Sequence, residues 1–250
     1  MKIVIVNGSV KKGATYESLK HIEKTLTAHG NYEFEYIHMK DLEIGFCKSC
    51  FRCFMEGEET CYQNDKINIY KEILLNADGI ILSSPVYAMN ISGAMKNFID
   101  SLTFLFHRPE LFHKKGMAVV TTMGSHGKKN ANYLKKVLSA FGVKDSLELN
   151  ITLFGRSISN EKILKKIEKS ALKYHKLLQS QTKSPTIKDL LWFSMWKANT
   201  QIEHATDYEF WKSKGWYESD YYYPIKINII KKLIGRLAYK FLTTVMPTKS

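Results

Sequence analysis

Short apolar runs alternate with longer amphipathic stretches along residues 1–182. Five of the short runs are rich in β-branched residues and predict strands. The first and third runs are nearly continuous in apolar residues, as expected for central strands that are covered on both faces. The predicted strands are 2–7, 33–38, 79–84, 116–122 and 147–153.

Helical periodicity fills the intervals between these runs. Apolar residues recur at spacings of three and four, as Ile163, Ile167 and Ala171 show in the last stretch. The predicted helices are 15–29, 65–76, 92–105, 128–141 and 160–179. Five strands and five helices in strict alternation favour an α/β fold with a doubly wound parallel sheet, in which ligands bind beyond the carboxyl ends of the strands.

The pattern changes at residue 183. Ser184 and Pro185 end the last predicted helix, and an aromatic-rich stretch then leads to a basic segment after Pro224. We therefore expect a domain of residues 1–182, with a cysteine loop at 45–63, and a helical aromatic and basic C-terminal extension at 183–250. A hydrophobic content of 44% over 250 residues excludes wholesale disorder.

All four cysteines fall between positions 47 and 61, in a chain whose N-terminus resembles a first strand more than a signal peptide. A secreted disulfide framework would spread its cysteines to join distant segments, whereas one tight cluster indicates a reducing compartment and a metal or redox role. No apolar run approaches the ~20 residues of a membrane span. We therefore expect a cytoplasmic protein.

The segment NGSVKKGAT, residues 7–15, follows the first predicted strand and begins the first helix. Its small residues allow a sharp turn, after which the N–H groups of the helix start can face an anion. Ser9 and Thr15 add hydroxyl groups, and Lys11 or Lys12 adds positive charge. The segment is neither a Walker A loop nor G-x-G-x-x-G, which disfavours ATP and a dinucleotide. The alternative is an ordinary β–α turn with Thr15 as the helix N-cap.

This segment resembles the phosphate loop of the flavodoxin-like NAD(P)H-dependent FMN reductases. SPVY at 84–87, followed by SGAMKNFID at 92–100, is similar to a second signature of that family, although Ser101 stands where an arginine is common. The resemblance covers residues 1–179. It implies a flavodoxin-like five-stranded sheet of order 2-1-3-4-5, with FMN as cofactor and NAD(P)H as electron donor.

The resemblance also implies roles for particular residues. The 5′-phosphate would be held by backbone amides together with Ser9, Lys11, Gly13 and Thr15. Pro85, Val86 and Tyr87 would border the isoalloxazine ring, and the loop after the fourth strand would close its other side through Thr122, Gly124 and Gly127. Two glycines in that loop permit close approach to a planar ligand.

Other residues near these motifs have simpler interpretations. Tyr87 can be a packed aromatic residue and Ser92 a helix cap, and Lys96 is better explained as a solvated helix residue. His126 is a single histidine in a loop, and such a residue more often has no role in catalysis than acts as a proton donor. Since the cofactor carries the chemistry of hydride transfer, we nominate no catalytic residue.

The cysteines follow the pattern C-x2-C-x2-C-x7-C, with Cys47, Cys50, Cys53 and Cys61 as its members. Thiolates at such intervals suit an iron–sulfur cluster. The pattern resembles the iron–sulfur flavoprotein branch of the same reductase family, which implies a [4Fe-4S] cluster. Zinc and a set of reduced thiols or a redox pair remain alternatives. Zinc is less favoured because its structural sites more often use two separated C-x2-C pairs.

Positive charge is concentrated near the C-terminus. The chain has 37 basic and 24 acidic residues, a formal charge of +13, and residues 221–250 contain no acid. That segment contains six cations, at Lys226, Lys231, Lys232, Arg236, Lys240 and Lys249. Ile229, Leu233 and Leu237 begin an apolar stripe, so an amphipathic helix is predicted.

We expect the apolar side of this helix to dock on the domain core or on a partner subunit. Binding of 225–250 to an anionic membrane surface is the less favoured alternative. The sequence contains no nucleic-acid-binding motif, so we expect no specific nucleic-acid partner.

Together these observations predict an FMN-dependent oxidoreductase, specifically an iron–sulfur flavoprotein. Its electrons would come from a reduced nicotinamide or a ferredoxin and pass to a small or protein acceptor. The resemblance implies a homodimer or homotetramer. One alternative is a cluster-free NAD(P)H-dependent quinone, azo or nitro reductase. Another is a non-enzymatic FMN electron carrier docked through its basic tail.

Overall fold

A computed structural model describes residues 1–201 and 205–245, and Lys249 with the rest of 246–250 lies outside the described residues. The chain divides into two compact units. The first unit comprises Met1–Lys48, Asp65–Leu105 and Pro109–Thr182. The second unit comprises Ser49–Asn64, Phe106–Arg108 and the described part of Lys183–Ser250. The cysteine-bearing segment is thus divided between the two units after Lys48.

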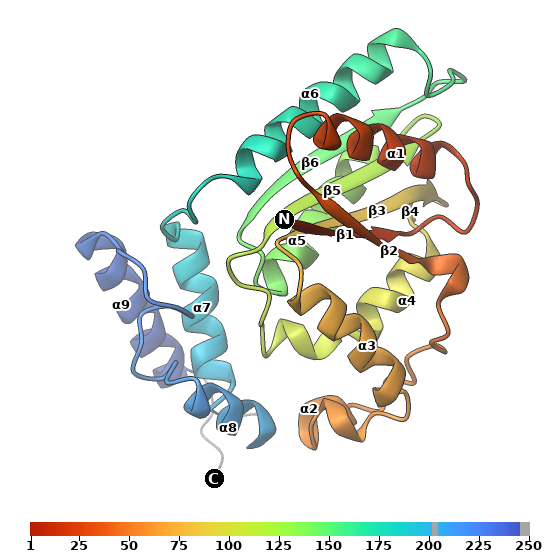
Figure 1. The fold of residues 1–250 in the computed structure, drawn as a ribbon. Coiled ribbons are helices and arrows are strands. Elements are labelled where there is room, and N and C mark those ends of the chain that lie inside the picture. The colour runs from red at the N-terminus through yellow and green to blue at the C-terminus, as the bar shows by residue number, and fades with distance from the viewer. Residues whose placement is uncertain (202–204, 246–250) are drawn as a thin grey trace. The chain divides into compact units, whose positions relative to one another are not determined.

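The first unit is built on a parallel sheet (Figure 1). Its parallel strands are β1 (Lys2–Asn7), β2 (Glu33–His38), β3 (Gly79–Tyr87), β5 (Lys115–Thr122) and β6 (Asp145–Thr152). They lie in the order β2-β1-β3-β5-β6. A two-residue strand, β4 (Asn90–Ile91), pairs antiparallel with the end of β3. Counted over the parallel strands alone, this order is the predicted 2-1-3-4-5, and the predicted fold class is confirmed.

The helices of this unit that lie between the parallel strands are α1 (Ala14–Thr27), α3 (Asn64–Leu75), α4 (Gly93–Ser101) and α5 (Gly127–Ala140), and α6 (Glu161–Leu178) follows β6. Figure 1 shows α1 and α6 on one face of the sheet and α3, α4 and α5 on the other. Each predicted helix is present. The helix expected over 92–105 ends at Ser101, and a 3₁₀ turn, η3 (Thr103–Phe106), follows it.

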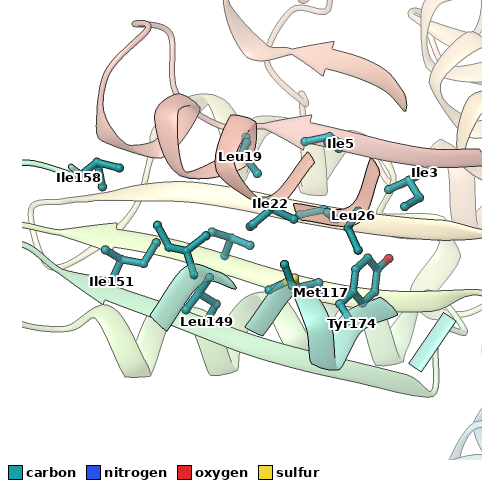
Figure 2. Packing of buried hydrophobic residues seen from close by; sticks show 14 of the residues in the cluster. Ile3, Ile5, Leu19, Ile22, Leu26, Met117, Leu149, Ile151, Ile158 and Tyr174 are labelled. Carbon is teal, nitrogen blue, oxygen red and sulfur yellow. The ribbon is translucent and has the colours of Figure 1, made fainter. Parts of the chain in front are cut away.

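The core on the α1 and α6 face joins strand side chains to two helices. Ile3 and Ile5 of β1 lie against Leu19 and Ile22 of α1, all of them fully buried (Figure 2). On the α6 side, the buried Tyr174 hydroxyl donates a hydrogen bond to the Lys115 carbonyl at 2.8 Å. Burial raises the pKa of this phenol. Burying each Ile or Leu side chain contributes about 1.5–3 kcal/mol, so the strand ends that carry the loops are held by a well-packed sheet.

The second unit forms its own core from the aromatic-rich stretch. Its helices are α2 (Arg52–Met55), α7 (Ile187–Asn199), α8 (Ala205–Ser213) and α9 (Ile229–Val245). Trp211 of α8 is fully buried, and its ring centroid lies 5.5 Å from that of Phe193 and 5.0 Å from that of Trp216. A capping box of Thr186 and Asp189 begins α7. The aromatic residues therefore have a structural explanation.

The last helix, α9, packs in an unexpected orientation. Its buried residue is Gly235, whose carbonyl accepts a hydrogen bond from the Ser194 hydroxyl of α7 at 2.8 Å. The apolar stripe expected to dock on the core is exposed instead, with Leu237 and Phe241 more than 60% accessible. The side of α9 that carries Gly235 packs on α7, whereas the side that carries the large apolar residues is exposed. This corrects the expectation that the apolar side docks on the chain's own core. Within the described residues, the structure has no helix long and apolar enough to cross a membrane.

Candidate flavin site and cysteine segment

The site expected from the sequence lies at one edge of the parallel sheet. In the strand register Asn7 of β1 pairs with Ser83 of β3, and Pro85 of β3 pairs with Thr121 of β5. The carboxyl ends of β1, β3 and β5 are therefore neighbours, and so are the loops that follow them. The chain order reverses between β1 and β3, which is where doubly wound sheets bind ligands.

Gly8 fixes the loop after β1 against the sheet. Its N–H donates a hydrogen bond to the Ser83 carbonyl at 2.8 Å, and its carbonyl accepts one from the Ser92 hydroxyl at 2.7 Å. A Cβ atom at this position would lie only 2.4 Å from the Ser83 carbonyl oxygen. Only glycine allows this approach, and the loop is therefore bound to both β3 and the start of α4.

The N-terminus of α1 lies at the end of this loop. Gly13 is its N-cap and supplies no side-chain cap, which differs from the alternative in which Thr15 caps the helix. Helix geometry leaves the first-turn N–H groups without an intrahelical acceptor, so these groups can bind an anion. An added Cβ at Gly13 would meet nothing within 4 Å among the described residues. The position is therefore open enough for a phosphate to approach.

The predicted phosphate-binding side chains have different surroundings. The Ser9 hydroxyl donates to the Lys11 carbonyl at 2.9 Å, which tightens the loop, and Lys11 itself is exposed. The Thr15 hydroxyl is buried and lies 2.6 Å from the Thr121 hydroxyl of β5. The Lys11 side chain is thus more accessible than the Ser9 and Thr15 hydroxyls, whose hydrogen bonds shape the loop.

A histidine that the sequence reasoning overlooked lies beside this loop. His38, the last residue of β2, has its Nδ1 3.2 Å from the Asn7 amide nitrogen. Burial lowers its pKa, and the nearby Lys40, Lys12 and Lys20 add to that effect. A neutral ring can accept the Asn7 hydrogen bond, so His38 contributes to holding the end of β1.

The end of β3 presents the three residues expected beside the flavin ring. Pro85 is buried, Val86 is half-buried and Tyr87 is half exposed, so solvent exposure increases along the end of the strand. Pro85 is fixed from behind, because its carbonyl accepts a hydrogen bond from the Ser84 hydroxyl at 2.8 Å. That hydroxyl also accepts one from the Ser92 N–H at 2.9 Å. Serines that the sequence treated as motif members therefore position the backbone of this strand end.

The turn after β3 is a part of the site that the sequence did not reveal. Ala88 and Met89 both have positive φ angles, of 45° and 67°, which non-glycine residues rarely adopt. Asn130 of α5 donates a hydrogen bond from its amide to the Met89 carbonyl at 3.0 Å. The unusual turn is thus tied to a helix more than forty residues away, which no local pattern indicates.

The loop after β5 gives different roles to its two glycines. A Cβ at Gly124 would meet nothing within 4 Å in the described structure, so this position is open to a ligand. A Cβ at Gly127 would lie 1.9 Å from the Asn150 side-chain oxygen. A side chain at position 127 would therefore displace the Asn150 amide, so Gly127 packs closely against β6. The loop is closed by the Thr122 hydroxyl, which donates to the Ser125 carbonyl at 2.7 Å.

The four cysteines form no disulfide in the described structure. Cys47 and Cys50 are exposed, and Cys53 and Cys61 are half-buried. Cys47 lies in the first unit, where its N–H donates to the Asn97 side-chain oxygen at 3.3 Å. Among the residues that the structure describes, no group of three metal-ligating side chains is gathered. Four cysteine thiolates are a donor set that fits an iron–sulfur cluster.

A buried ion network in the second unit lies directly beside the third cysteine. Arg108, which is 1% exposed, pairs with the equally buried Asp207 of α8. It also donates to the Glu58 carboxylate at 2.8 Å and to the Cys53 carbonyl at 2.6 Å. The network therefore connects the cysteine segment to the C-terminal extension within one unit.

His107 adds an aromatic stack to the same network. Its Nδ1 lies 2.7 Å from the second carboxylate oxygen of Asp207. Its ring centroid lies 4.2 Å from that of Phe54 and 4.3 Å from that of Trp196. Sequence reasoning missed both His107 and Arg108, because their partners are between about fifty and a hundred residues away and no spacing marks them.

The parallel sheet of order β2-β1-β3-β5-β6, with helices on both faces, defines a flavodoxin-like α/β protein. The family profile described as NADPH-dependent FMN reductase matches residues 1–150. The chain therefore belongs to the NADPH-dependent FMN reductase family and is an FMN-containing oxidoreductase with a nicotinamide donor.

Two curated relatives and one solved structure are similar to the chain. An iron–sulfur flavoprotein of Archaeoglobus fulgidus is 32% identical over 222 residues, which cover 86% of this chain and 99% of the relative. An iron–sulfur flavoprotein of Clostridioides difficile is 27% identical over 194 residues, which cover 76% and 85%. The apo form of an NADH:FMN oxidoreductase has a TM-score of 0.55 at 20% identity, covering 72% of this chain and 91% of that one. The relatives place the chain in the iron–sulfur flavoprotein branch, and the structural likeness confirms the fold.

Proposed function

We propose that this protein is an iron–sulfur flavoprotein that oxidises a reduced nicotinamide at an FMN bound to the edge formed by β1, β3 and β5. The observation that carries the proposal is the cradle around Gly8. This cradle is the loop between β1 and α1, which Gly8 holds in contact with β3. The loop leads to the N-terminus of α1, where Gly13 leaves space for a ligand, next to the point between β1 and β3 where the strand order reverses. Bound FMN supplies the redox chemistry, since it accepts a hydride and passes electrons on.

The chain's own residues bind and orient the cofactor in this proposal. The 5′-phosphate is held by the first-turn amides of α1, with Lys11 and the Ser9 and Thr15 hydroxyls around it and Gly13 leaving room for it. Pro85, Val86 and Tyr87 at the strand end would border the isoalloxazine ring on one side, and the loop at Thr122 and Gly124 would border it on the other. Gly127 contributes by allowing that second loop to pack.

The cysteine segment is the proposed site of a [4Fe-4S] cluster, with Cys47, Cys50, Cys53 and Cys61 as ligands. Support comes from four cysteines in one short segment, none of them in a disulfide in the described structure, and from the relatives named iron–sulfur flavoproteins. Four cysteine thiolates are the usual ligand set of such clusters. Arg108 holds the Cys53 carbonyl and would position that part of the segment.

The electron donor and assembly complete the proposal. NAD(P)H is the favoured donor and a ferredoxin the alternative, and the acceptor is a small molecule or a protein. We propose a homodimer or homotetramer in the cytoplasm, where reduced thiols persist. A cluster-free quinone, azo or nitro reductase with the same flavin site is the second candidate, because one relative is named an NADPH azoreductase.

Anaerobic purification with iron, sulfide and FMN analysis tests the proposal. We expect bound FMN together with about four iron and four sulfide per chain, and loss of the iron in Cys53→Ala with FMN retained. A Ser49→Ala variant is the matched control, because it alters the same segment without removing a thiol. FMN without iron or sulfide in the wild-type protein would favour the cluster-free reductase. Bound FMN that NAD(P)H does not reduce would favour a carrier.

A further inference from the structure

The second unit carries a continuous apolar surface that its own core does not use. We define the outer α9 face as the residues of α9 whose large apolar side chains are exposed: Ile229, Ile230, Leu233, Leu237, Phe241 and Val245. Each is between 52% and 67% accessible. Five of the six are spaced four apart along the helix, so they lie on one side of it. Exposed apolar patches of this kind mark interaction sites.

The outward orientation of this face is fixed by contacts on the other side of the helix. Gly235 packs on α7, where its added Cβ would lie 3.4 Å from the Leu190 Cβ. Asp220 accepts hydrogen bonds from Arg236 at 2.6 and 2.9 Å, and it lies 3.0 Å from the Lys232 ammonium. Since these contacts hold the helix in one rotational setting, the outer α9 face is directed away from the unit's own core.

The charges around this face indicate the kind of partner. Within α9 there are four cations and no acid, and residues 221–250 contain no acid at all. Lys240 on the helix and Lys226 just before it are exposed. Two copies of this face packed together would bring like charges close to one another. An anionic bilayer provides an apolar layer for the exposed apolar side chains and negative headgroups for the cations.

We propose that the outer α9 face docks in the plane of an anionic phospholipid bilayer. The seventeen residues of α9 extend about 25 Å, and the helix lies along the surface with Leu233, Leu237 and Phe241 in the boundary of headgroups and acyl chains. Lys226 and Lys240 interact with lipid phosphates. The flavoenzyme is thereby a peripheral membrane protein, which the FMN reductase family assignment does not imply.

Co-sedimentation of the full-length protein with lipid vesicles tests this proposal. One set of vesicles is phosphatidylcholine alone, and the other is an equal mixture of phosphatidylcholine and phosphatidylglycerol. We expect binding to the mixed vesicles that exceeds binding to the neutral ones by at least about tenfold, because about 1 kcal/mol is gained per cation near an anionic surface. High salt should reduce the difference.

Three variants separate the contributions. Leu237→Asp with Phe241→Asp removes apolar contact and should abolish binding, and Lys226→Glu with Lys240→Glu should lower binding to mixed vesicles by at least about tenfold. Ile69→Asp is the matched control, because Ile69 of α3 is 58% exposed and lies on the first unit. It should bind as the wild type does. Unchanged circular dichroism verifies that α9 remains folded.

Several results would overturn the proposal. Wild-type protein that stays in the supernatant with both vesicles would do so, as would α9 variants that bind like the control. If wild-type protein ignores vesicles and the Leu237→Asp, Phe241→Asp variant dissociates an oligomer in sedimentation velocity, a second copy of the chain covers this face instead.

Discussion

Replacing Gly8 with alanine tests the cradle on which the flavin site depends. The added Cβ would lie 2.4 Å from the Ser83 carbonyl oxygen, whereas ordinary contact begins at 3.4 Å. A displacement of 3.4 − 2.4, or 1.0 Å, is therefore required. Ser83 is a backbone neighbour of both β1 and β5 in the sheet, so the loop must move rather than the strand.

The cost of this displacement can be worked from the contacts that it breaks. The Gly8 N–H loses its bond to Ser83, and the Gly8 carbonyl loses the Ser92 hydroxyl, at about 1 kcal/mol each. Overpacking adds about 1–3 kcal/mol. We expect the free energy of unfolding to fall by about 3–5 kcal/mol, and FMN to bind at least about tenfold more weakly because the α1 amides shift with the loop.

Urea unfolding and titration with FMN, followed by flavin fluorescence, measure the two effects. Gly93→Ala is the control, because a Cβ there meets nothing within 4 Å in the described structure and alanine favours the first turn of α4. Gly13→Ala should keep its stability within about 1 kcal/mol yet weaken FMN binding, if the phosphate lies at the start of α1. An unchanged urea midpoint and FMN affinity in Gly8→Ala would refute the reasoning.

Three further predictions concern other parts of the structure. Ser92→Ala removes the helix cap of α4 and the bond to Gly8, and urea unfolding should show a loss of about 1–3 kcal/mol that Ser92→Thr partly restores. Arg108→Met leaves the buried Asp207 carboxylate without its guanidinium partner and should lower the stability of the second unit by about 3–5 kcal/mol. Adding Asp207→Leu removes the unpaired carboxylate and should recover part of that loss. Equal losses of stability in the single and double variants would argue against a buried ion pair. Hydrogen bonding from Arg236 lowers the pKa of Asp220, so its contribution is present above about pH 4 and disappears as pH falls through the lowered value. Thermal unfolding should therefore show that Asp220→Asn lowers the melting temperature at pH 7 and that this difference narrows below pH of about 4; a difference independent of pH would contradict it.

Hydrophobic periodicity was sufficient to predict the sheet because its central strands, β1, β3 and β5, are buried on both faces. The predicted strands over 2–7 and 33–38 match β1 and β2 in both ends. The third strand runs three residues further than predicted, to Tyr87. Ser83 and Ser84, polar residues at the end of the predicted strand, are both buried, and the Ser83 hydroxyl donates to the Val6 carbonyl at 3.0 Å.

The features that could not be predicted depend on contacts between distant segments. The close packing at Gly127 involves the Asn150 side chain, and the turn at Met89, which has a positive φ, is held by a hydrogen bond from Asn130. An amphipathic pattern revealed α9 but not which side of it packs, because Gly235 and Ser194 decide that. The ligand roles of Ser9, Lys11, Gly13 and Thr15 stay predictions.

The flavin site is tested most directly by reducing the bound cofactor under anaerobic conditions. Purified protein is supplied with FMN, excess flavin is removed, and NADPH is added while the flavin absorbance is recorded. We predict one FMN per chain and loss of its visible absorbance on addition of NADPH. A folded chain that retains no FMN, or retained FMN that stays oxidised with both NADPH and NADH, would contradict the central claim.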